Sequence, residues 1–239
     1  PAGETADLSK LNESMTEGYR IREDVRVPVL TFQSETDVVT LGGGRARQPD
    51  SERFRLWELA GAAHFDTYGL VAAHTDREGI AAEELAALIA PTANILGMSA
   101  ASMVNSGPQQ HYVLNAALAH LVRWVRDGVA APEAPRLETS DASGVVLVRD
   151  DLGIVRGGIR TPWVEAPSAV LSGDSPGGDG FLFLFGRTIP LEPHALAKLY
   201  PGGPQEHGKR FDAATTAALR AGFLLDADAD EIRALARHG

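Results

Sequence analysis

The chain has 239 residues, 44% of them hydrophobic, which is enough for one large domain or two small ones with a substantial core. No apolar run approaches the roughly 18 residues of a membrane-spanning helix, and a formal net charge of -10 at pH 7 makes nucleic acid an unfavourable partner. Cysteine is absent, which excludes disulfides, thiolate metal sites and a cysteine nucleophile. Pro1 stands where an initiator Met would, so we expect that the true N-terminus was processed, cut or left out.

The first half of the chain has the pattern of an α/β domain. Residues 1–24 are polar with weak helical spacing, which indicates a lead-in loop or helix. The run 25–32 (VRVPVLTF) predicts a strand covered on both faces, the best buried strand in the chain. The run 54–59 (FRLWEL) predicts a second strand. Helices are expected over 81–90 and 109–127, where apolar residues recur at helical spacing.

The composition changes after a Pro- and Ala-rich connector at residues 129–144, which marks a candidate subdomain boundary. Residues 145–148 and 154–155 flank an Asp-Asp-Leu-Gly turn and predict a hairpin. The apolar run 181–185 predicts another strand. Three short helices are expected to close the chain, over 193–200, 210–223 and 230–237.

A polar segment follows each of the two predicted strands of the first half. Residues 33–37 (QSETD) follow the first strand and residues 61–64 (GAAH) follow the second. Because functional groups gather beyond the carboxyl ends of parallel strands, a carboxylate and an imidazole are expected at the same edge. An Asp that accepts from His Nδ1–H leaves Nε2 to take a proton from a serine hydroxyl, as in a Ser-His-Asp triad.

These segments resemble the α/β-hydrolase superfamily. Residues 27–39 (VPVLTFQSETDVV) and 54–69 (FRLWELAGAAHFDTYG) are similar to its acid and histidine ends, in the same chain order. With 104–118 (VNSGPQQHYVLNAAL), 157–167 (GGIRTPWVEAP) and the LYP and AGFLL motifs, the chain resembles the C-terminal portion of bacterial alpha/beta hydrolase domain proteins. The resemblance runs from about residue 20 to the end.

The resemblance implies an α/β fold class, namely the C-terminal part of an α/β-hydrolase fold with a mostly parallel sheet flanked by helices. This core portion is expected over 1–133, and a smaller mixed α+β extension of a β-hairpin and helices is expected to pack on it over 134–239. Asp37 matches the acid of the family and His64 matches the general base. Glu35, two residues earlier, is a second candidate for the acid. The implied reaction is acyl transfer to water, as in carboxylic ester hydrolysis, with no cofactor or metal.

The nucleophile departs from the family pattern. The family places its serine on a strand–turn–helix well before the acid, and only 36 residues precede Asp37. The sequence G-x-S-x-G does occur at 173–177, but it follows His64, and Pro176 lacks the backbone N–H that an oxyanion hole needs. We therefore expect Ser175 to lie in a surface turn.

The expected partners are consequently a missing N-terminal part of the same hydrolase, which carries the serine and the oxyanion hole, and a small-molecule ester. The alternative is an α/β-hydrolase-like module without catalysis that serves binding or assembly. Residues 105–108 (NSGP) either face the active site or form the turn that opens the next helix. The acidic run 226–231 lacks the Gly and Glu of an EF-hand loop, and is expected to be a helix N-terminus.

Overall fold

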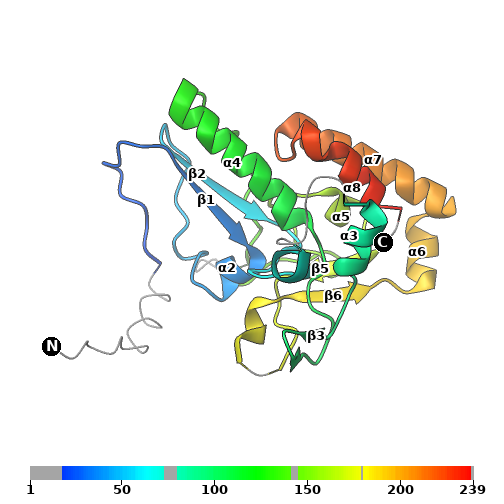
Figure 1. The fold of residues 1–239 in the computed structure, drawn as a ribbon. Coiled ribbons are helices and arrows are strands. Elements are labelled where there is room, and N and C mark those ends of the chain that lie inside the picture. Colours follow the sequence, from blue (N-terminus) through cyan, green and yellow to red (C-terminus); the bar gives the residue numbers. More distant parts are fainter. Residues whose placement is uncertain (1–17, 73–79, 141–144, 179, 238–239) are drawn as a thin grey trace.

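A computed structural model of the chain describes residues 18–72, 80–140, 145–178 and 180–237 (Figure 1). Most of the predicted lead-in segment and the end of the connector, at 141–144, lie outside these ranges. The strands are β1 (Val29–Ser34), β2 (Phe54–Leu59), β3 (Asn94–Ile95), β4 (Met98–Ser99), β5 (Ala169–Ser172) and β6 (Arg187–Pro190). The α-helices are α2 (Glu35–Val39), α3 (Ala82–Leu88), α4 (Gln109–Asp127), α5 (Pro162–Glu165), α6 (Pro193–Leu199), α7 (Gly203–Ala221) and α8 (Ala229–Leu235).

The strands β1 and β2 form a parallel pair, so that their carboxyl ends lie at the same edge (Figure 1). The prediction of β2 is confirmed at both ends. The first strand begins only after Pro28, which has no N–H for a ladder, and it continues to Ser34. Residues 29–33 are only half-buried, whereas β2 is almost wholly buried, so the prediction that the first strand is the best buried was wrong. The reason is that, within the described ranges, β1 pairs with β2 alone and is an edge strand.

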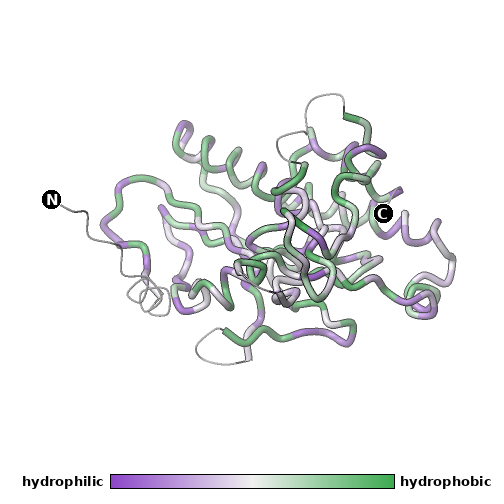
Figure 2. Tube along the Cα trace, turned by 60° about the horizontal axis from the view of Figure 1, so that its bottom comes forward, coloured by the Kyte–Doolittle hydropathy of each residue, from purple (hydrophilic) through white to green (hydrophobic). Residues whose placement is uncertain are grey.

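Helix α4 spans the predicted residues and packs against β1 (Figure 1). It ends at Gly128, whose φ of 71° places it in the left-handed region that glycine adopts without strain. Hydrophobic and hydrophilic stretches alternate along this helix in Figure 2. One face is buried in the core, while a second apolar stripe is exposed and consists of Leu114, Leu118, Val122 and Val125.

The largest hydrophobic core cluster combines residues from both halves of the chain. Trp57 of β2 and Tyr112 of α4 belong to the same cluster as Ile159, Phe211 of α7 and Ile232 of α8. Helices α7 and α8 lie on the opposite side of the molecule from β1 in Figure 1. The two predicted parts of the chain therefore share this core, and the boundary between 1–133 and 134–239 stays a prediction.

The second half departs from its predicted elements at several places. The hairpin forms, through isolated antiparallel bridges such as the one between Arg149 and Val155. The run 181–185 is a 3-10 helix, η2 (Gly180–Leu184), so the predicted strand was wrong. Leu182 and Phe185 are buried at the three-residue spacing of a 3-10 turn, and such a short apolar run has no periodicity that distinguishes the two structures.

A further departure is an antiparallel pair, β5 with β6, which the sequence did not predict. The three closing helices are confirmed as α6, α7 and α8, but α7 begins at Gly203 rather than at Arg210. Pro204 fits this earlier start, because proline is tolerated in the first turn of a helix. No helix in the described part of the chain is long and apolar enough to cross a membrane.

Candidate active site

Asp37 lies in the first turn of α2, directly beyond the carboxyl end of β1. Ser34 caps this helix: its Oγ accepts from the Asp37 N–H at 3.3 Å. In return, Oδ2 of Asp37 accepts from the Ser34 N–H at 2.7 Å and from its hydroxyl at 2.7 Å. This capping box engages Oδ2 only, so it fixes the carboxylate while Oδ1 stays available for another partner.

His64 lies in the turn that follows β2. The turn passes through Gly61, whose φ is +73° and where a Cβ would lie 2.7 Å from Val164 and 2.8 Å from Gln109. Because the two strands are parallel, this turn and the first turn of α2 meet at one edge. Nδ1 of His64 lies 2.6 Å from Oδ1 of Asp37, which is the contact expected of an acid and its histidine.

The ring of His64 is held on one side and open on the other. The hydrogen bond that Nδ1 of His64 donates to Asp37 raises the pKa of His64 above its ordinary value, against partial burial, which lowers it. Nε2 has no hydrogen-bond partner in the described ranges, and the side chain is 38% exposed. Phe65 packs edge-on against the ring, with the ring centroids 4.9 Å apart. A neutral imidazole held in this way presents the Nε2 lone pair, which is the geometry of a general base.

Glu35, the second candidate for the acid, has other partners. Its buried carboxylate accepts from the backbone N–H of Gly61 at 2.6 Å and of Gly173 at 3.0 Å, and lies 3.4 Å from Nη2 of Arg149. Burial raises the pKa of Glu35 to about 7, against the nearby Arg149 and the two N–H donors, which lower it. The structure therefore brings Asp37, and not Glu35, to Nδ1 of the histidine.

The segment 105–108 forms the turn that opens α4. The side chain of Asn105 is buried and donates to the carbonyl oxygens of Gly61 at 2.9 Å and of Ser172 at 3.1 Å. Its Oδ1 accepts from the Gly107 N–H at 2.9 Å. Asn105 thus ties the turn that carries the histidine to the end of β5.

Ser175 lies in an exposed turn, as predicted. Its Oγ accepts from the Gly177 N–H at 3.2 Å, and Pro176 follows it without an N–H to donate. The next described helical element is the 3-10 helix η2, so the strand–turn–helix context of a nucleophile is missing.

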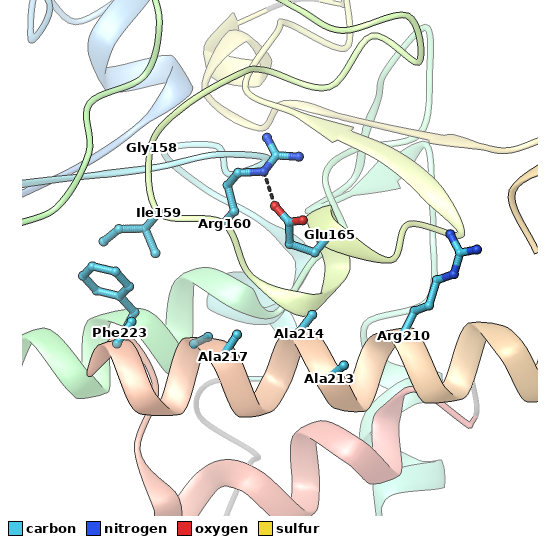
Figure 3. A pocket seen from close by; sticks show the side chains of 11 residues that line it. Gly158, Ile159, Arg160, Glu165, Arg210, Ala213, Ala214, Ala217 and Phe223 are labelled. Carbon is cyan, nitrogen blue, oxygen red and sulfur yellow. Dashed lines mark hydrogen bonds and ion pairs between the residues drawn. The ribbon is translucent and has the colours of Figure 1, made fainter.

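A pocket of about 460 Å³ lies between α7 and residues 158–165. Figure 3 shows alanine side chains along the α7 side of this pocket. Its charged side chains are paired, Arg160 with Glu165 and Arg210 with Glu206.

The described ranges contain no cluster of three or more His, Asp or Glu side chains that could hold a metal ion. The acidic run at 226–231 forms a 3-10 turn, η3 (Asp226–Asp228), and the start of α8.

Sequence reasoning missed the groups that hold the acid and the histidine in place. The capping box has a local signal, because Ser34 stands three residues before Asp37. No local signal identifies the partners of Glu35, since Gly173 lies 138 residues away and Arg149 lies 114 residues away.

The family resemblance is confirmed by comparison with known proteins. A family model described as an alpha/beta hydrolase domain matches residues 2–234, and the chain belongs to this family. Searches among curated proteins and among solved structures gave no match.

Proposed function

We propose that this chain supplies the acid and the base of a Ser-His-Asp triad in a serine hydrolase that cleaves carboxylic esters. The observation that carries the proposal is the contact between Oδ1 of Asp37 and Nδ1 of His64 at 2.6 Å, while Nε2 has no hydrogen-bond partner among the described residues. Membership of the alpha/beta hydrolase family supports a hydrolytic reaction. Asp37 and His64 are thus proposed as catalytic residues, whereas Glu35 is not part of the proposed triad.

The roles follow from the two ring nitrogens. Asp37 holds the proton on Nδ1, so that Nε2 of His64 takes the proton of a serine hydroxyl as Oγ attacks the ester carbonyl carbon. The protonated ring then gives this proton to the departing alkoxide, and an acyl-enzyme forms. Water attacks the acyl-enzyme in the same way, with its proton passing through Nε2, and releases the carboxylic acid and the free serine. The Asp37 carboxylate favours the transient imidazolium, in line with the raised pKa of His64.

The serine is proposed to lie on polypeptide outside these 239 residues, in an N-terminal part of the same hydrolase. In this fold the oxyanion hole is built around the nucleophile and an earlier loop, so it is assigned to the same part. The exposed turn of Ser175, followed by Pro176, disfavours the G-x-S-x-G sequence of this chain as the nucleophile site.

Two surfaces of the described chain support a missing neighbour. On the β2 side, the Val29 N–H donates to the carbonyl oxygen of Arg53. In a parallel strand the backbone N–H and C=O groups of alternate residues point to the opposite edge, which here is the edge of β1 away from β2. That edge carries no strand in the described ranges, although parallel sheets are ordinarily covered and larger. The exposed apolar stripe of α4 is a second surface suited to burial. We propose that both are covered by the N-terminal part of the hydrolase.

A fluorophosphonate probe, which labels activated serines, tests this proposal on the complete hydrolase. We expect one labelled serine outside the 239 residues, located by peptide mass spectrometry, and hydrolysis of a short nitrophenyl ester. His64→Ala should abolish both. Ser175→Ala should leave the hydrolysis rate within about threefold, because exposed turn substitutions are mild.

Labelling of Ser175, or hydrolysis that survives His64→Ala, would overturn the proposed triad. A complete protein with neither labelling nor hydrolysis would instead favour a module for binding or assembly.

A further inference from the structure

The buried carboxylate of Glu35 connects the two turns that carry the proposed catalytic pair. Glu35 is the first residue of α2, in the same turn as Asp37. Its Oε1 accepts from the N–H of Gly61, in the turn that leads to His64, at 2.6 Å. A backbone bond of 3.1 Å from Glu35 N–H to Ala62 O joins the same two turns.

A third segment is held by the same residue. Oε2 of Glu35 accepts from the Gly173 N–H at 3.0 Å, and the neighbouring Thr36 donates its hydroxyl to the Gly173 carbonyl at 2.8 Å. A Cβ at Gly173 would lie 2.5 Å from both Cβ of Glu35 and the backbone N of Thr36, so only glycine permits this approach. The first glycine of the G-x-S-x-G sequence therefore serves as a support for α2.

The charge of Glu35 faces one cation within the described ranges. Nη2 of Arg149 lies 3.4 Å from Oε2, and the same nitrogen binds Asp174 at 2.8 Å. Arg187 binds the other oxygen of Asp174 at 2.9 Å. A buried, paired carboxylate gives little net stability over an apolar residue of the same volume, so packing alone gives no reason for an acid here.

We propose that Glu35 is a positioning residue, whose carboxylate clamps the Asp37 turn to the His64 turn and thereby sets the contact between acid and base. Oε1 accepts from Gly61 in the His64 turn, and Oε2 accepts from Gly173, to which Thr36 of the Asp37 turn also donates. The inference rests on the proposed function for its catalytic consequence, but the geometry that it explains is independent of the reaction.

The chain offers a matched control. Glu58 is equally buried, binds Arg47 at 2.7 Å through each oxygen, and accepts from the Leu137 N–H at 2.8 Å. It therefore has the same kinds of partner as Glu35, but they belong to segments that carry neither member of the pair. Glu35→Gln and Glu58→Gln each replace one acceptor oxygen by an NH₂ group with little change in volume.

The experiment compares both variants in the complete hydrolase by ester kinetics and by NMR titration of the histidine rings. We expect Glu35→Gln to lower kcat by about 10- to 100-fold with KM within about threefold, since misplacement of a catalytic group acts mainly on the chemical step. It should also lower the pKa of His64, because a looser Asp37 contact favours the imidazolium less. Glu58→Gln should change neither kcat beyond about threefold nor the His64 titration.

If Glu35→Gln does not fold, Thr36→Val breaks the other side-chain link from α2 to Gly173 without changing a charge. It should lower kcat and the pKa of His64 in the same direction. Equal effects of the two glutamine variants, or an unchanged His64 titration in Glu35→Gln and in Thr36→Val, would overturn the positioning role. If the complete hydrolase has no esterase activity, the proposed function is refuted but the positioning role is not. The His64 titration still decides whether Glu35 sets the contact between Asp37 and His64.

Discussion

Loss of either member of the Asp37–His64 pair should remove most of the proposed catalysis, and loss of both should cost little more. We expect His64→Ala and Asp37→Asn each to lower kcat by about 10³- to 10⁴-fold. If the residues acted independently, two losses of about 10⁴ would multiply to about 10⁸, or roughly 11 kcal/mol of activation free energy. Because Oδ1 of Asp37 acts through Nδ1 of His64 at 2.6 Å, the double variant should lie within about tenfold of His64→Ala.

The structure separates this effect from folding. In Asp37→Asn the remaining oxygen still accepts from Ser34 in the capping box, while the NH₂ group faces Nδ1 and forces the proton onto Nε2. The ring is then the wrong tautomer for a base, although α2 keeps its cap. Ser34→Ala does the reverse: it removes the cap, which costs about 0.5–2 kcal/mol of unfolding free energy, and should lower kcat by less than about tenfold.

The pH dependence of hydrolysis tests the effect of Asp37 on the pKa of His64. The base must be neutral, so kcat/KM should rise as pH rises through the pKa of His64, which Asp37 raises. Asp37→Asn removes the cause of that shift, and the acid limb should move to lower pH. Hydrolysis of nitrophenyl acetate across pH 5 to 9, about the window in which histidine titrates, measures both quantities, with thermal unfolding to verify the fold. Multiplicative losses, or an acid limb that does not move, would refute the reasoning.

Two further predictions concern stability. Burial raises the pKa of Asp66 from 3.8 to about 7, so this group lowers stability as pH rises between those values. Asp66→Asn keeps an acceptor for the Gly69 N–H. It should stabilise the protein by up to about 4 kcal/mol at pH 8, and by less than about 1 kcal/mol at pH 4. Chemical denaturation at the two pH values checks this, and an equal effect at both would contradict it. If the N-terminal part of the hydrolase covers the stripe of α4, as we propose, Val122→Asp in the complete hydrolase should cost more than about 2 kcal/mol. The exposed Arg123→Glu should cost less than about 0.5 kcal/mol. Similar small losses of unfolding free energy in both variants would mean that the stripe is exposed to solvent in the complete hydrolase.

Local sequence determined the elements whose signals lie within one segment. The run 54–59 forms a buried strand, and 109–127 forms a helix that ends at its left-handed glycine, because periodicity and end signals act over a few residues. Chain order then sufficed to place Asp37 and His64 beyond neighbouring strands, since parallel strands deliver their carboxyl ends to one edge.

Only the tertiary structure shows which of the two acids in one helical turn contacts His64. Glu35 and Asp37 are both near the strand end. Glu35 instead accepts from the N–H groups of Gly61 and Gly173, which no local pattern connects to it. The same limit explains the strand predicted over 181–185 and the unexpected pairing of β5 with β6. A short segment takes the structure that its distant neighbours can pack and hydrogen-bond, because its own propensity is worth less than those contacts.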